Sequence, residues 1–145
     1  MKSTRPIPEI IADTSALIAF FVRSEEHHED ARQYMVAHPK TRWIILESVF
    51  DETVTWFRAK VSVRDSIAVG HVLREDHWYR NLSDDDDAAT WEAFCRYDDK
   101  AWSYTDCSIL VMAQRLGVPQ VFAFDEHIRQ MTGLGIVSVP LEAEQ

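Results

Sequence analysis

The sequence predicts a three-layer α/β/α fold with a mostly parallel central sheet of about five strands. Short apolar segments, typical of buried strands, alternate with longer segments of helical character along almost the whole chain. Two of these apolar segments are followed at once by an aspartate. The 145 residues contain four glycines, no repeat and no low-complexity linker, so we expect one domain over residues 1–145. Its core should span about residues 9–140, with loose ends at 1–8 and 141–145.

Each element is expected from its local pattern. The strands are predicted at residues 9–12, 43–46, 78–82, 120–124 and 136–139. The helices are predicted at residues 16–22, 26–37, 46–61, 65–77, 88–97, 103–117 and 126–131. In the helix over 46–61, the apolar positions Leu46, Phe50, Val54, Phe57 and Val61 define one face. A second apolar stripe at Val49, Trp56 and Ala59 suits a second buried side, either a dimer contact or a crowded monomer core.

The acidic composition excludes some classes of function. With 24 Asp and Glu against 15 Lys and Arg, the net charge is −9. This balance argues against non-specific DNA coating, which needs a basic face, but carboxylates around a metal are compatible with a nuclease. Two cysteines give neither a disulfide framework nor a zinc-binding pair, so we expect a reduced, cytoplasmic setting. No apolar run is long enough to span a membrane, and the first residues do not resemble a signal peptide.

Two aspartates are the first candidates for chemistry. Asp13 and Asp125 each follow a predicted strand, and ligands of parallel sheets collect at the carboxyl ends of strands. Hard carboxylate oxygens select Mg²⁺ or Mn²⁺, and Mg²⁺ keeps waters that leave room for a phosphate. For Asp13, an ordinary helix-capping role explains the sequence equally well.

Other acids have competing explanations. Asp106 lies three residues after Ser103, the spacing of a capping box, yet a carboxylate at a helix start can also be a ligand. The run from Asp84 to Asp87 follows Ser83, and we interpret it as a cap and first turn rather than a metal site. Cys107 lies where a thiolate would be favoured, but no histidine can be assigned to activate it.

The helix over 46–61 carries three acids, Glu47, Asp51 and Glu52. On a helical wheel Glu52 lies nearly opposite the main apolar face, so spacing does not choose it over Asp51. The histidines show no zinc-binding spacing and are interpreted as surface residues: His27, His28, His38, His71, His77 and His127.

Four segments resemble the PIN domain family, specifically the VapC-like ribonuclease toxins of toxin–antitoxin pairs. They are IIADTSALIAFF, ESVFDETVTWF, WSYTDCSILVMAQRLG and QVFAFDEHIRQM, and their order and spacing match from Ile10 to Val139. The resemblance implies an acidic site of Asp13, Glu52, Asp106 and Asp125. It is the resemblance, and not the wheel, that selects Glu52. By the same match, small hydroxyl residues would orient the ligands: Ser15, Ser103 and Thr105.

The resemblance also implies the activity and the partners. The four acids would hold Mg²⁺ or Mn²⁺, which would lower the pKa of a bound water for endonucleolytic hydrolysis of RNA. A homodimer and a small antitoxin protein are expected. RNA needs cations at the rim of such a site, and we propose as phosphate contacts Arg58, Lys60, Arg64 and Arg129. Trp56, Trp78, Trp91 and Trp102 could stack bases, although packing explains most of them.

Other classes fit less well. A signalling receiver domain would need paired acids after its first strand and a phosphoacceptor aspartate after its third, but Thr14 follows Asp13 and residues 80–82 supply no acid. A phosphatase with an aspartyl nucleophile would need an acid at Ser15. A non-catalytic RNA-binding or scaffold domain of the same fold is the remaining alternative, and the complete acid set disfavours it.

Overall fold

The computed structural model describes residues 6–141, and its centre is a five-stranded sheet in the order β3-β2-β1-β4-β5. All four strand pairings are parallel, so the expected sheet is confirmed. The strands are β1 Glu9–Ala12, β2 Arg42–Leu46, β3 Trp78–Arg80, β4 Gln120–Phe122 and β5 Val137–Val139. The helices are α1 Thr14–Phe21, α2 His28–Ala37, α3 Glu47–Lys60, α4 Val63–Glu75, α5 Asp84–Arg96, α6 Tyr104–Leu116 and α7 Glu126–Arg129, with a short 3₁₀ turn at Thr132–Leu134.

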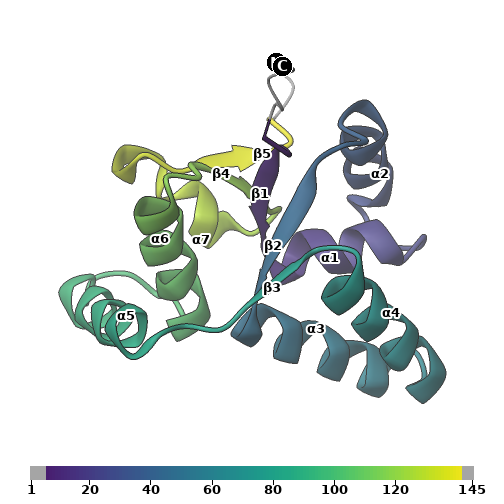
Figure 1. Cartoon of the computed structure of the whole chain (residues 1–145), viewed down its shortest axis with the longest axis horizontal. Helices are drawn as coiled ribbons and strands as arrows, with labels where there is room; N and C mark the ends of the chain where they lie inside the picture. Colours follow the sequence, from purple (N-terminus) through teal and green to yellow (C-terminus); the bar gives the residue numbers. More distant parts are fainter. Residues whose placement is uncertain (1–5, 142–145) are drawn as a thin grey trace, which may run out of the picture.

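The order of the strands determines the three layers. From β1 through β2 to β3 the chain moves outward in one direction, and it then returns to place β4 on the other side of β1. Because crossovers between parallel strands are right-handed, this reversal sends the later helices to the opposite face. Figure 1 shows α1 to α4 on one side of the sheet and α5, α6 and α7 on the other. The strand order therefore reverses between β1 and β4, where parallel sheets open a crevice for ligands.

The buried strands form the core. Ile11, Ile45, Val121 and Phe122 are fully buried, as expected of strands covered by helices on both faces. Some predicted ends shift: α2 begins at His28, β3 ends at Arg80, and β4 ends at Phe122 instead of residue 124. The three residues between Phe122 and the first residue of α7 form a short connection, so Asp125 follows the strand less directly than predicted.

The predicted apolar face of α3 is only partly confirmed: Leu46 and Phe57 are buried and Phe50 packs against the core, but the buried side of the helix is centred elsewhere. The residues of this helix that are buried are Val49, Thr53 and Phe57, whereas Val61 is 47% exposed at the helix end. The hydroxyl of Thr53 donates a hydrogen bond to the carbonyl oxygen of Val49 at 2.7 Å. Because this hydroxyl has a partner, a polar residue can occupy the core position. Val49 is therefore a core residue, not part of an outward stripe available for a dimer contact.

The ends of the chain are only partly described. Of the predicted loose segments, residues 1–5 and 142–145 lie outside the described residues. The carbonyl of Pro8 accepts a 2.9 Å hydrogen bond from the amide of Arg42, so the chain is already fixed to β2 just before β1. Within residues 6–141, no helix has the length and apolar character needed to cross a membrane.

Candidate functional site

Asp13 directly follows β1, at the point where the strand order reverses between β1 and β4, and this region is called the crevice below. The amide of Asp13 donates to the carbonyl of Phe122 at 2.8 Å, which extends the pairing of the two strands to this residue. Its side chain, 4% exposed, caps α1. One carboxylate oxygen, Oδ2, accepts from the amide of Ser15 at 3.2 Å and from its hydroxyl at 2.5 Å. Both of these hydrogen bonds use Oδ2, and no hydrogen bond to Oδ1 is found within residues 6–141.

The pKa of Asp13 is raised, mainly by burial and further by the charges of neighbouring carboxylates. Burial raises this pKa to about 6, the two hydrogen bonds from Ser15 oppose the rise, and the charges of Asp125 and Asp106 add to it. Carboxylates that repel one another in a buried place form a site whose charge a divalent cation would offset.

Asp106 enters the site from the start of α6. Its carboxylate Oδ2 accepts from the amide of Ser103 at 2.9 Å, while its own amide donates to the Ser103 hydroxyl at 3.0 Å. The predicted capping box is therefore present. The same Oδ2 lies 2.9 Å from Nδ1 of His127. With 4% of Asp106 exposed, its carboxylate is turned inward to the crevice.

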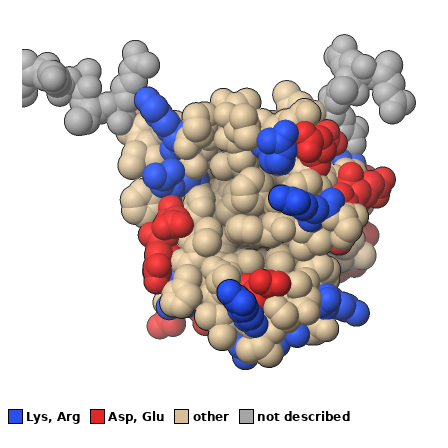
Figure 2. Space-filling view, turned by 90° about the vertical axis from the view of Figure 1, so that its right-hand side faces the viewer, with Lys and Arg blue, Asp and Glu red and all other residues tan. Residues whose placement is uncertain are grey.

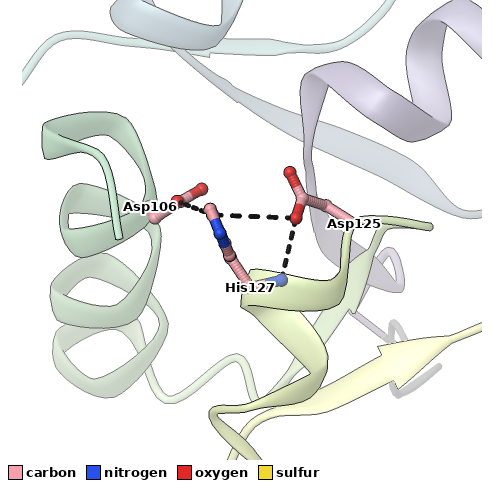
Figure 3. A group of neighbouring side chains, drawn as sticks. All are labelled: Asp106, Asp125 and His127. Atoms are coloured by element: carbon pink, nitrogen blue, oxygen red, sulfur yellow. Dashed lines mark hydrogen bonds and ion pairs between the residues drawn. The ribbon is translucent and has the colours of Figure 1, made fainter. Parts of the chain in front are cut away.

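Asp125 and His127 complete the visible cluster. Asp125 caps α7, and its Oδ1 accepts from the backbone amide of His127 at 2.8 Å and lies 3.8 Å from Nδ1 of that ring. Figure 3 shows the imidazole between the carboxylates of Asp106 and Asp125. One ligand atom from each of the three residues lies within 4.8 Å of the others, a spacing that can hold a metal ion.

Glu52 approaches from α3 and is exposed. Its Oε1 accepts a 2.8 Å hydrogen bond from the hydroxyl of Thr14, the residue after Asp13. Asp51, the alternative acid, lies within hydrogen-bonding distance of Thr55, one turn along its own helix, with 3.4 Å between Oδ1 and the hydroxyl. Because the buried face of α3 is centred on Val49 and Thr53, Glu52 lies beside that face rather than opposite it. The structure thus brings Glu52, and not Asp51, next to the Asp13 segment.

The predicted orienting residues differ in what they contact. The hydroxyl of Ser15 donates to Asp13 and accepts from the amide of Phe124 at 3.0 Å, so it links the two strand ends. Ser103 caps the helix that carries Asp106. Thr105 is buried, and its carbonyl accepts from the hydroxyl of Ser108 at 2.6 Å.

The predicted RNA contacts lie farther from the acids. Arg58 and Lys60 occupy the last turn of α3, at the opposite end from Glu47, and Arg64 lies in the first turn of α4. Figure 2 looks onto the side that carries α2 and α4 and shows Lys and Arg side chains around a broad uncharged centre. Arg129, in the last turn of α7, lies 3.9 Å from Glu126. Contact between RNA and the three α3–α4 cations therefore requires a strand that runs along α3.

Two histidines contradict the expectation of surface residues. His127 belongs to the acidic cluster, and the sequence signal that could have found it is its place in the helix turn opened by Asp125. His77 stacks on Trp43 with ring centroids 4.2 Å apart, and its Nδ1 accepts from the amide of Trp43 at 3.0 Å. Burial first, then the charge of Arg42, lowers the pKa of His77 to about 4, against a small opposing effect of Asp76.

The remaining candidates have structural roles. In the Asp84–Asp87 run, Asp86 forms a capping box with Ser83 and an ion pair with Arg115 at 2.9 Å, as the capping interpretation predicts. Cys107 is buried, and burial followed by the charge of Asp106 raises the pKa of its thiol. The thiolate expected at this helix start is therefore disfavoured.

A comparison of the sequence with family models matches the PIN domain over residues 10–134. The chain belongs to the PIN domain family. The family resemblance drawn from the four segments is thereby confirmed. No curated protein matches the sequence.

Two solved structures have a fold similar to that of this chain. The crystal structure of VapC20 from Mycobacterium tuberculosis, described as a sarcin–ricin loop cleaving toxin, aligns with a TM-score of 0.79 at 21% identity, covering 90% of this chain and 98% of that one. PAE2754 from Pyrobaculum aerophilum aligns with a TM-score of 0.57 at 19% identity, covering 92% of this chain and 90% of that one. At these identities the likeness concerns the PIN fold.

Proposed function

We propose that this PIN domain is a metal-dependent endoribonuclease, and that it is the toxin of a toxin–antitoxin pair. The observation that carries the proposal is the cluster of Asp106, Asp125 and His127, whose ligand atoms lie within 4.8 Å of one another, together with the buried Asp13 at the end of β1. Carboxylates that share one small volume serve to bind a cation, and RNA is the substrate type of the VapC20 toxin with the same fold. The expected reduced, cytoplasmic setting suits such a substrate.

The donor set fits a divalent cation. The pKa of Asp13 is raised in part by Asp106 and Asp125, so bound positive charge would relieve a repulsion that already exists. Carboxylate donors favour Mg²⁺ or Mn²⁺. We propose Asp13, Glu52, Asp106 and Asp125 as the residues that hold it. When bound, the ion would polarise the scissile phosphate and lower the pKa of a bound water.

The four acids would have different roles according to their exposure. Asp13 and Asp106 are buried and each is held by hydrogen bonds, which fixes the donor geometry. Asp125, with 38% of its side chain exposed, and Glu52 are accessible from outside. Glu52 and Asp125 are therefore the carboxylates that can orient the attacking water. His127 would act as a positioning residue, since it contacts both Asp106 and Asp125.

The activity can be tested with purified protein and labelled single-stranded and hairpin RNA. We expect cleavage in Mn²⁺ or Mg²⁺ that stops with EDTA and with Asp125→Asn. Asp98→Asn, which changes an exposed acid in the connection between α5 and α6, is the matched control and should cleave like the wild type. Cleavage that persists in EDTA would overturn the metal-dependent mechanism, and metal binding without cleavage would favour the scaffold alternative.

An antitoxin would have an apolar groove available between α3 and α4. The groove has a volume of about 480 Å³ and is lined by Phe50, Val54 and Ile67, among others. Ile67 and the neighbouring Val63 are 51% and 57% exposed, and such exposed apolar residues mark protein-binding surfaces. Co-expression with the protein encoded beside this gene should yield a complex that Ile67→Asp disrupts and Asp98→Asn does not. If Ile67→Asp leaves the complex unaffected, the antitoxin does not bind in the groove between α3 and α4.

The homodimer would use α5 instead of α3. Trp91 is 58% exposed and Phe94 39% exposed, and their rings stack with centroids 5.8 Å apart. Large exposed aromatic residues are enriched at interfaces. Light scattering after size-exclusion chromatography should show a dimer for the wild type and a monomer for Trp91→Ser. A dimer that survives this change would exclude α5 as the interface.

A further inference from the structure

A second hollow opens at the same edge of the sheet, beyond the ends of β2 and β3. We call it the edge cavity; its volume is about 630 Å³, within the range of about 300–1,000 Å³ usual for small-molecule sites. Its walls come from the first turns of α3, from β3, and from the starts of α5 and α6. None of its lining residues is among the acids proposed to bind metal.

The edge cavity adjoins the acidic crevice along two helices. Tyr104, which lines it, lies two residues before Asp106 in the first turn of α6. Asp51 lines it from α3, next to Glu52, whose carboxylate is bonded to Thr14 on the crevice side. A nucleotide strand whose phosphate lay at the crevice would therefore have a neighbouring base within reach of the edge cavity.

Three aromatic side chains line the edge cavity: Phe50, Tyr79 and Tyr104. Phe50 and Tyr79 meet edge to face with centroids 5.3 Å apart, and Tyr104 lines it from α6. The guanidinium of Arg74 lies 4.2 Å from the centroid of Tyr79 and 5.1 Å from that of Phe50, which supports these rings. Tyr104 is fixed by donating its hydroxyl hydrogen to Asp87. Fixed aromatic rings are the usual stacking partners of unpaired bases.

Most of the polar groups that line the edge cavity are carboxylates: Glu47, Asp51, Asp84 and Asp87. Asp87 accepts from Tyr104 and Asp51 from Thr55, whereas Glu47 accepts no hydrogen bond from the described residues. The oxygen of Ser48 is buried and has no hydrogen-bond partner in residues 6–141. No Lys or Arg is among the described residues that line the cavity, so a phosphate would find no counter-charge there. The complementary ligand is a flat group with neighbouring N–H donors.

We propose that the edge cavity binds a base of the RNA substrate, and that it prefers guanine. Guanine presents a ring N–H beside an amino group, so one carboxylate can accept both, whereas uracil offers a single N–H donor. Asp51 would accept these hydrogen bonds, and the rings of Phe50, Tyr79 and Tyr104 would pack against the base. The proposal rests on the proposed ribonuclease function and makes the edge cavity its specificity-determining subsite.

The test is a binding titration in EDTA, where no cleavage takes place. The full-length protein is titrated with GMP, AMP, CMP and UMP, and with N-acetyl-arginine amide, by calorimetry or by NMR. We expect GMP to bind best, and Asp51→Asn to weaken it by about tenfold, the usual size of one two-point carboxylate contact. Tyr79→Leu should weaken all four nucleotides together. Asp30→Asn, an exposed acid on α2, is the matched control and should leave GMP binding unchanged.

Each outcome separates the possibilities. Equal binding of all nucleotides, no binding of any, or an affinity for GMP that Asp51→Asn leaves unchanged would overturn the proposal. Binding of the arginine compound in preference to GMP would also overturn it and assign the cavity to a protein side chain. Failure of the ribonuclease proposal is seen separately, as absence of RNA cleavage by the wild type in Mn²⁺, whatever the nucleotides do in EDTA.

Discussion

The molecule contains two groups of aspartates with opposite environments. In the Asp84–Asp87 run, four acids follow one another in the first turn of α5, where the helix dipole favours them and Arg115 pairs with Asp86. In the crevice, Asp13, Asp106 and Asp125 come from three separate segments, and His127 contacts two of them, Asp106 and Asp125. The pKa of Asp86 is lowered, chiefly by the Ser83 backbone, whereas that of Asp13 is raised to about 6.

The difference shows that the density of acids along the sequence says little about a metal site. Consecutive residues of a helix point in different directions, so a run of four carboxylates spreads over the surface. Acids that converge from separate elements remain close even though they repel one another. Helix capping explains the run. The crevice acids also cap helices, and the proposed cation would account for their proximity to one another.

Substitution of a crevice acid should have the largest effect on the rate of RNA cleavage. Asp106→Asn should lower the rate of RNA cleavage by about 10²–10³-fold, because removal of one charged ligand weakens transition-state stabilisation by that order. Asp85→Asn, in the run, should leave the rate unchanged. Single-turnover cleavage at saturating Mn²⁺ measures both. Equal losses in the two variants would remove the distinction between the clusters.

Without metal, substitution of a crevice acid should stabilise the folded protein. Because the pKa of Asp13 rises from 3.8 to about 6 on folding, the ionised carboxylate destabilises the folded state increasingly as pH rises through this interval. Asp13→Asn should therefore raise the free energy of unfolding above pH 6 by up to roughly 3 kcal/mol. The gain should vanish below pH 3.8, where the carboxyl is protonated in both states. Urea unfolding in EDTA at pH 8 and pH 3.5 measures it, and a variant less stable than the wild type at pH 8 would contradict the account.

The positioning role of His127 predicts a smaller effect. His127→Ala should weaken Mn²⁺ binding by about tenfold, because residues that orient metal ligands typically contribute that much. His71→Ala is the matched control, since His71 is exposed and pairs only with Glu75 among the contacts recorded for it. Calorimetric titration with Mn²⁺ measures both variants. Unchanged affinity in His127→Ala would make this ring a neighbour of the site without a role in it.

The acidic run should show the smallest effect, and only on stability. Ser83→Ala removes the hydroxyl that accepts from the amide of Asp86 at 3.0 Å, so it should lower the free energy of unfolding by about 1 kcal/mol. Mn²⁺ affinity should not change. A loss of Mn²⁺ affinity in this variant would show that the run takes part in metal binding after all.

Local pattern predicted the sheet and three of the four acids for a physical reason. In a parallel sheet the carboxyl ends of the strands share one edge, so Asp13 and Asp125 could be expected to approach each other from strand positions alone. Asp106 could be identified because it lies three residues after Ser103, the spacing of a capping box. Whether these residues bind metal is a separate question, which local pattern leaves open.

Glu52 and His127 could not be found in this way. The face of α3 was misassigned because Thr53 occupies a core position by bonding its hydroxyl to Val49, while the apolar Val61 lies exposed at the helix end. A wheel that counts apolar residues correctly predicts an exposed Glu52, but it gives no sign that this side chain contacts Thr14 beside Asp13. His127 forms no spacing motif with any other histidine, and its partners come from α6 and from the residue before α7. Both positions depend on tertiary packing.

The most direct test of the central claim is a Mn²⁺ titration followed by electron paramagnetic resonance, comparing the wild type with Glu52→Gln, Asp125→Asn and Asp85→Asn. The account predicts saturable binding by the wild type and by Asp85→Asn, and clearly weaker binding in the two crevice variants. Binding that is equal in all four proteins, or absent from the wild type, would contradict the claim that the convergent acids form one metal site.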